Sequence, residues 1–188
     1  MGYTIAEAAL DAGHDVVLIS GPVNLAPPRN TRFISAGTSD EMFKAVHRHA
    51  RESDICVLCA AVADYKPAKV SPAKIKKRGD RMSLELIATC DILESLGQQR
   101  DRPFLLVGFA AETDQIEKNA WGKLRRKNCD IIVANDARIA METDENELLI
   151  LFRDGETKKI SRSPKTFLAR ELVKIFVNSQ QKRLTKKM

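Results

Sequence analysis

The sequence predicts a single α/β domain over residues 1–188, with a Rossmann-like, doubly wound, mainly parallel sheet and helices on both faces. Three observations predict this fold. The chain has 188 residues, which suits one domain with its own core. Its composition, with 44% hydrophobic and 30% charged residues, is that of an ordinary globular protein. Its apolar pattern alternates between helical spacing and short continuous runs, which is typical of strands that alternate with helices.

The first part of the chain predicts repeated strand–helix winding. Residues 3–12 have the spacing of an amphipathic helix, and Gly13 is a typical helix stop. The runs HDVVLIS and ICVLC are continuous and apolar, as in strands buried on both faces. The expected elements are a helix at 3–12, strands at 14–20 and 31–34, a helix at 39–51 capped by Ser39, and a strand at 55–59. No strand is expected before the first helix, so the first strand of the winding is missing.

Residues 63–90 predict a flap that protrudes from the sheet. The segment from Lys66 to Arg81 is punctuated by prolines and carries seven Lys or Arg against one Asp. The following MSLELIA alternates strictly, which predicts a half-exposed strand at 82–88. No aromatic residue follows Tyr65 in the basic stretch, so a compact anion suits it better than a nucleic-acid strand.

The second half of the chain resumes the winding and ends in a hairpin and a helix. We expect helices at 91–96 and 114–127, strands at 104–110 and 130–136, a hairpin of 146–152 and 157–160 around Asp154-Gly155, a helix at 163–181, and a frayed basic tail at 182–188. Residues 153–188 hold 11 Lys or Arg and 3 Asp or Glu, so the net charge of +6 is concentrated there. We therefore expect no nucleic-acid partner.

Membrane and secretory classes are excluded by the same sequence. No apolar run approaches the roughly 18 residues that a membrane-spanning helix needs. Residues 1–10 lack both the basic flank and the apolar stretch of a secretory signal. We expect a cytoplasmic protein without a membrane partner.

Candidate ligand-binding residues follow the predicted strand ends, where open α/β sheets bind ligands. Asp64 follows the strand at 55–59 and could accept hydrogen bonds from a base or sugar, although it could equally be a solvated loop residue. Lys123 and Lys127 are four residues apart on one helix face, which suits either an anion site or an ordinary helix surface. Asp91 has the place of a helix N-cap.

Other motifs are weaker. Cys56 and Cys59 lie in an apolar run and are interpreted as buried thiols rather than metal ligands. The sequence contains neither GxGxxG nor GxxxxGK[ST], which counts against a nicotinamide-dependent oxidoreductase of the same fold. No histidine has the setting of a catalytic triad.

Taken together, several segments resemble one family. They are GPVNLA at 21–26, AAVADY at 60–65, KIKK at 74–77, GFAAET at 108–113 and IVAND at 132–136. In this order and spacing they resemble the bacterial phosphopantothenate-cysteine ligase, the synthetase half of the bifunctional coenzyme A biosynthesis flavoprotein. The resemblance implies that the chain uses CTP and Mg²⁺ to ligate 4'-phosphopantothenate with cysteine through an acyl-cytidylate. It also implies a homodimer with the flap at its interface, and a flavin-dependent decarboxylase as a partner or fused domain.

The resemblance also implies which residues form the site. Lys74, the first lysine of KIKK, corresponds to the catalytic lysine, which reaches the triphosphate from the flap. The nucleotide-contacting positions correspond to Ala60, Ala61, Asp64, Lys74, Cys90, Asp91, Ile92, Leu93, Phe109, Lys123 and Lys127. The resemblance assigns no residue to the metal.

Two departures from the family pattern affect this expectation. Cys90 stands where the family has proline, although the acid that follows it is kept. The family also carries a strand and an Asn- and Ser-rich turn, ending in Gly-Lys, just before the position of Met1. The alternative to a ligase is therefore a catalytically incomplete nucleotide-binding or dimerising module of the same fold.

Overall fold

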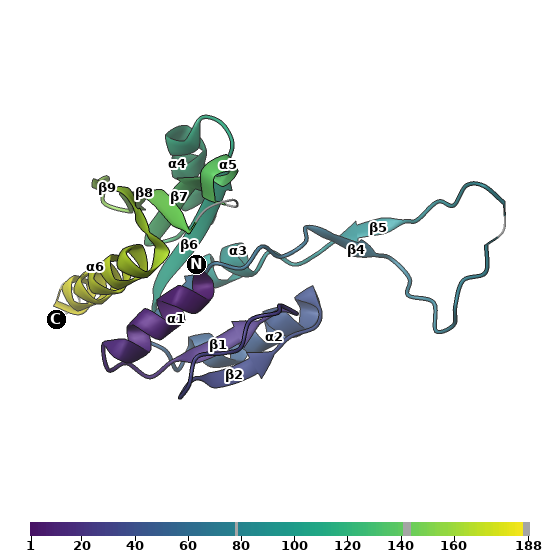
Figure 1. The fold of residues 1–188 in the computed structure, drawn as a ribbon, viewed down its shortest axis with the longest axis horizontal. Helices are drawn as coiled ribbons and strands as arrows, with labels where there is room; N and C mark the ends of the chain where they lie inside the picture. The colour runs from purple at the N-terminus through teal and green to yellow at the C-terminus, as the bar shows by residue number, and fades with distance from the viewer. Residues whose placement is uncertain (78, 141–143, 186–188) are drawn as a thin grey trace.

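The sheet that organises the molecule has five strands, and three of them are parallel (Figure 1). The computed structural model describes residues 1–77, 79–140 and 144–185. The strand order is β3 (Ile55–Leu58), β6 (Leu105–Glu112), β7 (Ile131–Asp136), β8 (Glu145–Phe152) and β9 (Thr157–Pro164). Strands β3, β6 and β7 are parallel, and β8 and β9 continue the sheet as an antiparallel hairpin. The predicted mainly parallel α/β fold is confirmed.

Helices cover both faces of this sheet, as the doubly wound pattern requires. One face carries α1 (Gly2–Asp11) and α6 (Lys165–Thr185), and the other carries α2 (Ser39–Ala50), α3 (Ile92–Gly97) and α4 (Ile116–Arg126). Side chains alternate along a strand, so β6 sends Leu105 and Val107 to the first face and Leu106 to the second. The short α5 (Ala137–Ala140) follows β7 and was not expected from the sequence.

Two further strands form a separate parallel pair. β1 (Val17–Ser20) hydrogen-bonds only to β2 (Arg32–Ser35), and β3 hydrogen-bonds only to β6, so in the described residues both β1 and β3 keep one open edge. The start of α1 touches the carboxyl ends of both strands. The Tyr3 hydroxyl donates to Ser20 Oγ at 3.0 Å, and a Cβ on Gly2 would lie 3.6 Å from that of Cys59.

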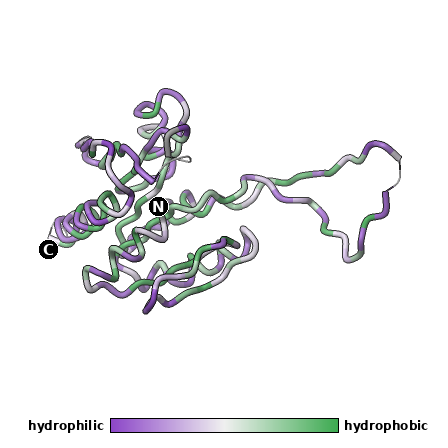
Figure 2. Tube along the Cα trace, viewed as in Figure 1, coloured by the Kyte–Doolittle hydropathy of each residue, from purple (hydrophilic) through white to green (hydrophobic). Residues whose placement is uncertain are grey.

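The flap at residues 63–90 projects far from the sheet (Figure 1). Its base is a small antiparallel ladder of β4 (Tyr65–Pro67) with β5 (Leu86–Ala88). The strand expected at 82–88 is therefore limited to its last three residues, and these are exposed rather than half-buried, because the ladder packs on no core. Hydrophobic stretches appear in green along the flap in Figure 2. The large apolar side chains that are exposed on the flap are Tyr65, Val70, Ile75, Met82, Leu84, Leu86 and Ile87.

Two predicted helix ends were wrong. Helix α2 is capped by Thr38, one residue before the expected Ser39, because Thr38 and Glu41 exchange hydrogen bonds in a capping box. The expected fraying at residues 182–188 does not begin at 182, because α6 continues to Thr185. The Arg183 guanidinium donates to the carbonyls of Arg102 and Pro103 at 2.6 and 2.9 Å and holds this last turn. Residues 186–188 lie outside the described residues.

No described helix is both long and apolar enough to cross a membrane.

Candidate functional site

The expected nucleotide contacts on α3, β6 and α4 form one cluster. The Lys127 ammonium donates to Asp91 Oδ2 and to Glu94 Oε2, both at 2.6 Å. One helical turn earlier, Lys123 Nζ donates to the Phe109 carbonyl at 2.7 Å. The structure therefore brings Asp91, Phe109, Lys123 and Lys127 together where β6 approaches its carboxyl end, as expected for a ligand site of this fold.

Helix α3 holds its part of the cluster in place by capping and packing. Asp91 Oδ1 accepts from the Glu94 amide at 2.8 Å, so the same carboxylate caps α3 and binds Lys127. Ile92 and Leu93 are buried in the core, and Leu93 fits against the bare backbone of Gly108, where a Cβ would lie 2.7 Å from Leu93 Cδ2. Ile92 and Leu93 thus lie beside the cluster as core residues.

Electrostatics keep the cluster ionised. Burial opposes the charge on Lys127, but its hydrogen bonds to Asp91 and Glu94 outweigh burial and raise the Lys127 pKa. Burial likewise opposes the charge on Asp91, yet the hydrogen bonds from Lys127 and the Glu94 amide lower the Asp91 pKa. Glu94 was not among the expected site residues. Its position three residues after Asp91, on the same face of a helix, is the sequence signal that could have found it.

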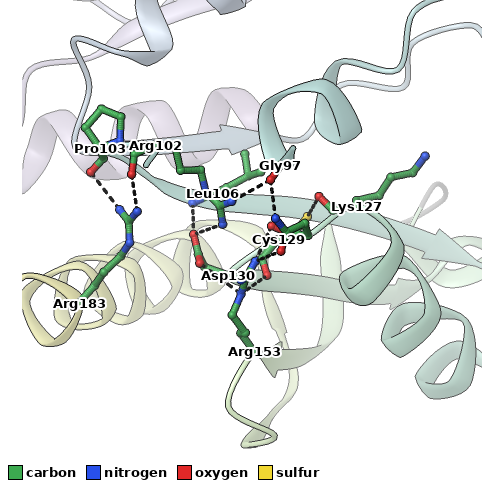
Figure 3. Close-up of polar contacts among 10 residues, drawn as sticks. Gly97, Arg102, Pro103, Leu106, Lys127, Cys129, Asp130, Arg153 and Arg183 are labelled. Atoms are coloured by element: carbon green, nitrogen blue, oxygen red, sulfur yellow. Dashed lines mark hydrogen bonds and ion pairs between the residues drawn. The ribbon is translucent and has the colours of Figure 1, made fainter. Parts of the chain in front are cut away.

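A polar cluster of Arg102, Leu106 and Asp130 lies next to the end of α3 (Figure 3). Asp130 Oδ2 accepts from Arg102 and from the Leu106 amide, each at 2.8 Å, and Arg102 also donates to the Gly97 carbonyl at 3.1 Å. The Lys127 side chain extends away from this group (Figure 3). The polar cluster therefore holds the Gly97 carbonyl at the end of α3, where Asn128, just past α4, also donates to it. Lys127 faces Asp91 and Glu94 instead.

The turn after β3 joins the same region through Thr89. The Thr89 amide donates to the Asp64 carbonyl at 2.9 Å, and its hydroxyl donates to the Ala63 carbonyl at 2.6 Å. Ala60, Ala61 and Asp64 are exposed in this turn. Because Thr89 lies two residues before Asp91, these bonds connect the turn to the start of α3 and leave the Asp64 side chain open to a ligand.

Lys74 is not brought to this cluster within one chain. It is exposed in the loop of the flap beyond β4 and β5, which projects from the body of the molecule (Figure 1). At the base of the flap, Lys66 pairs with Asp40 on α2 at 2.5 Å. Within a single chain, Lys74 therefore lies away from the cluster of Asp91, Lys123 and Lys127.

Cys90, which stands beside Asp91, differs from the other thiols in its exposure. It is exposed, whereas burial raises the pKa values of Cys56 and Cys129 to about 12. We expect a thiol reagent such as Ellman's reagent to modify Cys90 rapidly at neutral pH, and Cys56 and Cys129 only after unfolding, because the thiolate is the reacting form. Peptide mapping of the labelled protein checks this. Early labelling of Cys129 in the folded chain would contradict it.

Two cavities lie elsewhere. One of about 580 Å³ lies between α1 and α6 and is lined by residues such as Asp11, His14 and Lys174. Another, of about 210 Å³, lies past the end of β7 beside Asn135 and Asn146. Neither is lined by an expected nucleotide contact.

Magnesium is an expected cofactor, and a protein site for it would need several carboxylates close together. Among the described residues no group of three or more His, Cys, Asp and Glu side chains could hold a metal ion. The two carboxylates in the cluster, Asp91 and Glu94, are both bound to Lys127. The described residues do not fit a metal held by protein carboxylates alone.

Comparison with known proteins gives a consistent result. The chain is 43% identical over 187 residues to the coenzyme A biosynthesis bifunctional protein CoaBC of Haemophilus influenzae, covering 98% of this chain and 46% of that protein. It is 44% identical over 164 residues to the CoaBC protein of Bacillus subtilis, covering 85% of this chain and 40% of that protein. The chain thus spans less than half the length of these curated relatives.

A solved structure and a family model agree with these relatives. The crystal structure of the C-terminal domain of a CoaBC protein superposes with a TM-score of 0.78 at 35% identity, over 99% of this chain and 82% of that one. A family model described as DFP, the DNA/pantothenate metabolism flavoprotein C-terminal domain, matches residues 1–179. The resemblance seen in the sequence is confirmed, and the chain belongs to the family of DNA/pantothenate metabolism flavoprotein C-terminal domains.

Proposed function

We propose that this chain is a ligase that joins 4'-phosphopantothenate to cysteine and consumes CTP. The observation that carries the proposal is the cluster of Asp91, Lys123 and Lys127 at the end of β6, next to the open turn that holds Asp64. Membership of the family supports it, because the relatives of this chain are named for coenzyme A biosynthesis. The proposal includes a single domain over residues 1–188.

The proposed reaction has two steps. The carboxylate of 4'-phosphopantothenate attacks the α-phosphorus of CTP, forming an oxygen–phosphorus bond as the bond to the β-phosphate breaks and pyrophosphate leaves. The amine of cysteine then attacks the acyl carbon, an amide bond forms, CMP leaves and the amine releases a proton. The mixed anhydride replaces one difficult condensation with two easier displacements.

The residues take roles that match their surroundings. The exposed turn of Ala60 and Ala61 lets a nucleotide approach the backbone, and Asp64 accepts a hydrogen bond from the base or sugar. Lys123 and Lys127 neutralise phosphate oxygens, because an anion that attacks another anion needs charge compensation. Cys90 to Leu93 carry Asp91 at the start of α3, and Phe109 contributes the backbone carbonyl that binds Lys123. Mg²⁺ enters this proposal as the counter-ion of the triphosphate.

The flap supplies the remaining lysine in a dimer. Lys74 is remote from Lys127 within one chain, and the exposed apolar side chains of the flap are suited to pack on a second copy. We therefore infer a homodimer in which the flap brings Lys74 of one chain to the cluster of the other. A flavin-dependent decarboxylase is the proposed partner or fused domain, since the curated relatives are bifunctional and more than twice as long as the matched part.

A second candidate function is a nucleotide-binding or dimerising module without turnover. The placement of Lys74 away from the cluster favours it. A coupled assay with CTP, 4'-phosphopantothenate and cysteine, following pyrophosphate, separates the two. Pyrophosphate release that depends on 4'-phosphopantothenate supports the ligase. Binding of CTP without release supports the module, and no binding of CTP contradicts both.

Replacing Lys74 with glutamine tests the catalytic lysine. We expect pyrophosphate release to fall about 100-fold while the dissociation constant for CTP changes little, because the lost charge acts mainly where charge develops. Lys69→Gln, an exposed lysine of the same flap, is the matched control and should retain wild-type release. Unchanged release by the Lys74 variant would remove this residue from the mechanism.

A further inference from the structure

Lys127 is hydrogen-bonded to two carboxylates, although one would balance its charge. Its side chain is only 10% exposed and lies between the carboxylates of Asp91 and Glu94, 2.6 Å from each. One carboxylate balances one ammonium, so the second gives this trio a net charge of −1. A triphosphate that approaches the site therefore meets a lysine that is already fully paired.

The two carboxylates are not held equally. Asp91 uses its other oxygen to cap α3, so moving it would leave the Glu94 amide without its acceptor. Among the described residues, the other oxygen of Glu94 accepts only a 3.2 Å bond from the Gln98 amide on the surface. Exposure does not distinguish the two, since Asp91 is 46% exposed and Glu94 36%, but the Glu94 side chain is longer by one methylene and caps no described helix, so it can turn into water without disturbing the cap.

This difference identifies the group that yields to a ligand. We propose that Glu94 is a displaceable counter-ion of Lys127: it positions the lysine in the free protein and competes with the phosphates of a bound nucleotide. The inference deepens the proposed function and rests on it for the identity of the ligand. The raised pKa of Lys127 fits this picture, since the lysine stays charged before any ligand arrives.

The main test is the affinity of Glu94→Gln for two probes, CTP and inorganic tripolyphosphate, by isothermal titration calorimetry. The variant keeps the shape of the side chain and removes its charge. We expect both probes to bind about fivefold more tightly, since a partly exposed pair is worth up to about 1 kcal/mol, or about a fivefold change. Equal or weaker binding would overturn the proposal.

Glu171→Gln is the matched control. Glu171 pairs with Lys174 at 2.8 Å on α6, so its replacement removes the same charge and a similar ion pair away from the site. We expect its affinity for both probes to equal that of the wild type. An equal gain in this control would show a general effect of net charge and would overturn the proposal.

Two readouts tie the effect to Lys127. In a Lys127→Gln background, Glu94→Gln should leave affinity unchanged, because the competed lysine is gone; a full fivefold gain there would overturn the proposal. NMR titration of the Lys127 ammonium should give a lower pKa in Glu94→Gln than in the wild type, and an unchanged pKa would overturn it. The tripolyphosphate and NMR measurements require no ligase activity. A wild type that binds tripolyphosphate but not CTP would refute the proposed function and leave this inference standing.

Discussion

Gly97→Ala is expected to lower the free energy of unfolding by about 3 kcal/mol, at the upper end of the cost of overpacking a core. Gly97 is the last residue of α3, and a Cβ there would lie 1.8 Å from the Lys127 carbonyl oxygen and 2.9 Å from its carbonyl carbon. Both are backbone atoms at the end of α4, so the clash cannot be relieved by rotating a side chain. The two helices must separate, and with them Asp91 and Lys127.

Urea denaturation followed by circular dichroism measures the change, and Gly122→Ala is its matched control. Gly122 is a helical glycine of α4, and beyond the backbone of its own helix nothing lies within 4 Å of an added Cβ. Alanine there should be neutral or should stabilise the protein by up to ~1 kcal/mol through its higher helix propensity. Equal stability of the two variants would contradict the close contact between Gly97 of α3 and the Lys127 carbonyl at the end of α4.

Asp130→Ala is expected to cost about 3–5 kcal/mol, the range for breaking one side of a buried ion pair. The substitution removes the acceptor of the Leu106 amide and the counter-ion of Arg102, whose side chain is 7% exposed. An Arg102 without its partner keeps its charge in the interior, because guanidinium does not lose its proton at ordinary pH.

Thermal and urea unfolding of Asp130→Ala should agree on this loss. Glu171→Ala is the control, because the Glu171–Lys174 pair is exposed and such pairs are worth at most about 1 kcal/mol. A loss below 1 kcal/mol in the Asp130 variant would indicate that water reaches Arg102 and replaces the carboxylate.

The elements of the sheet were predictable because their patterns are local. The apolar runs of β6 and β7 and the helical spacing of α4 are complete within each segment, and the structure has them close to the expected bounds. The cap of α2 was misplaced by one residue because Thr38 and Ser39 are both good caps, and only the bond from Glu41 distinguishes them.

The candidate site was predictable only in part, because its contacts join residues that are far apart in the sequence. The sequence alone offered Asp91 as a helix N-cap and Lys127 as one of two lysines on a helix face, and only the family resemblance assigned both to the nucleotide. Their contact joins residues 36 positions apart. Periodicity cannot show such a contact, nor the close approach of Gly97 to Lys127 or the meeting of Arg102 with Asp130. The position of Lys74 depends on what the flap packs against, so a single chain does not determine it.

The open edges of β1 and β3 have a consequence for pairing with other molecules. Each edge presents unpaired backbone N–H and C=O groups, which can template pairing with an extended segment of another molecule. Pairing between β1 of one copy and β3 of the next is heterologous, and contacts of that kind grow into open filaments where no rotation closes the ring. An extended segment that paired with one of these edges would add a strand to the β1–β2 pair or to the five-stranded sheet.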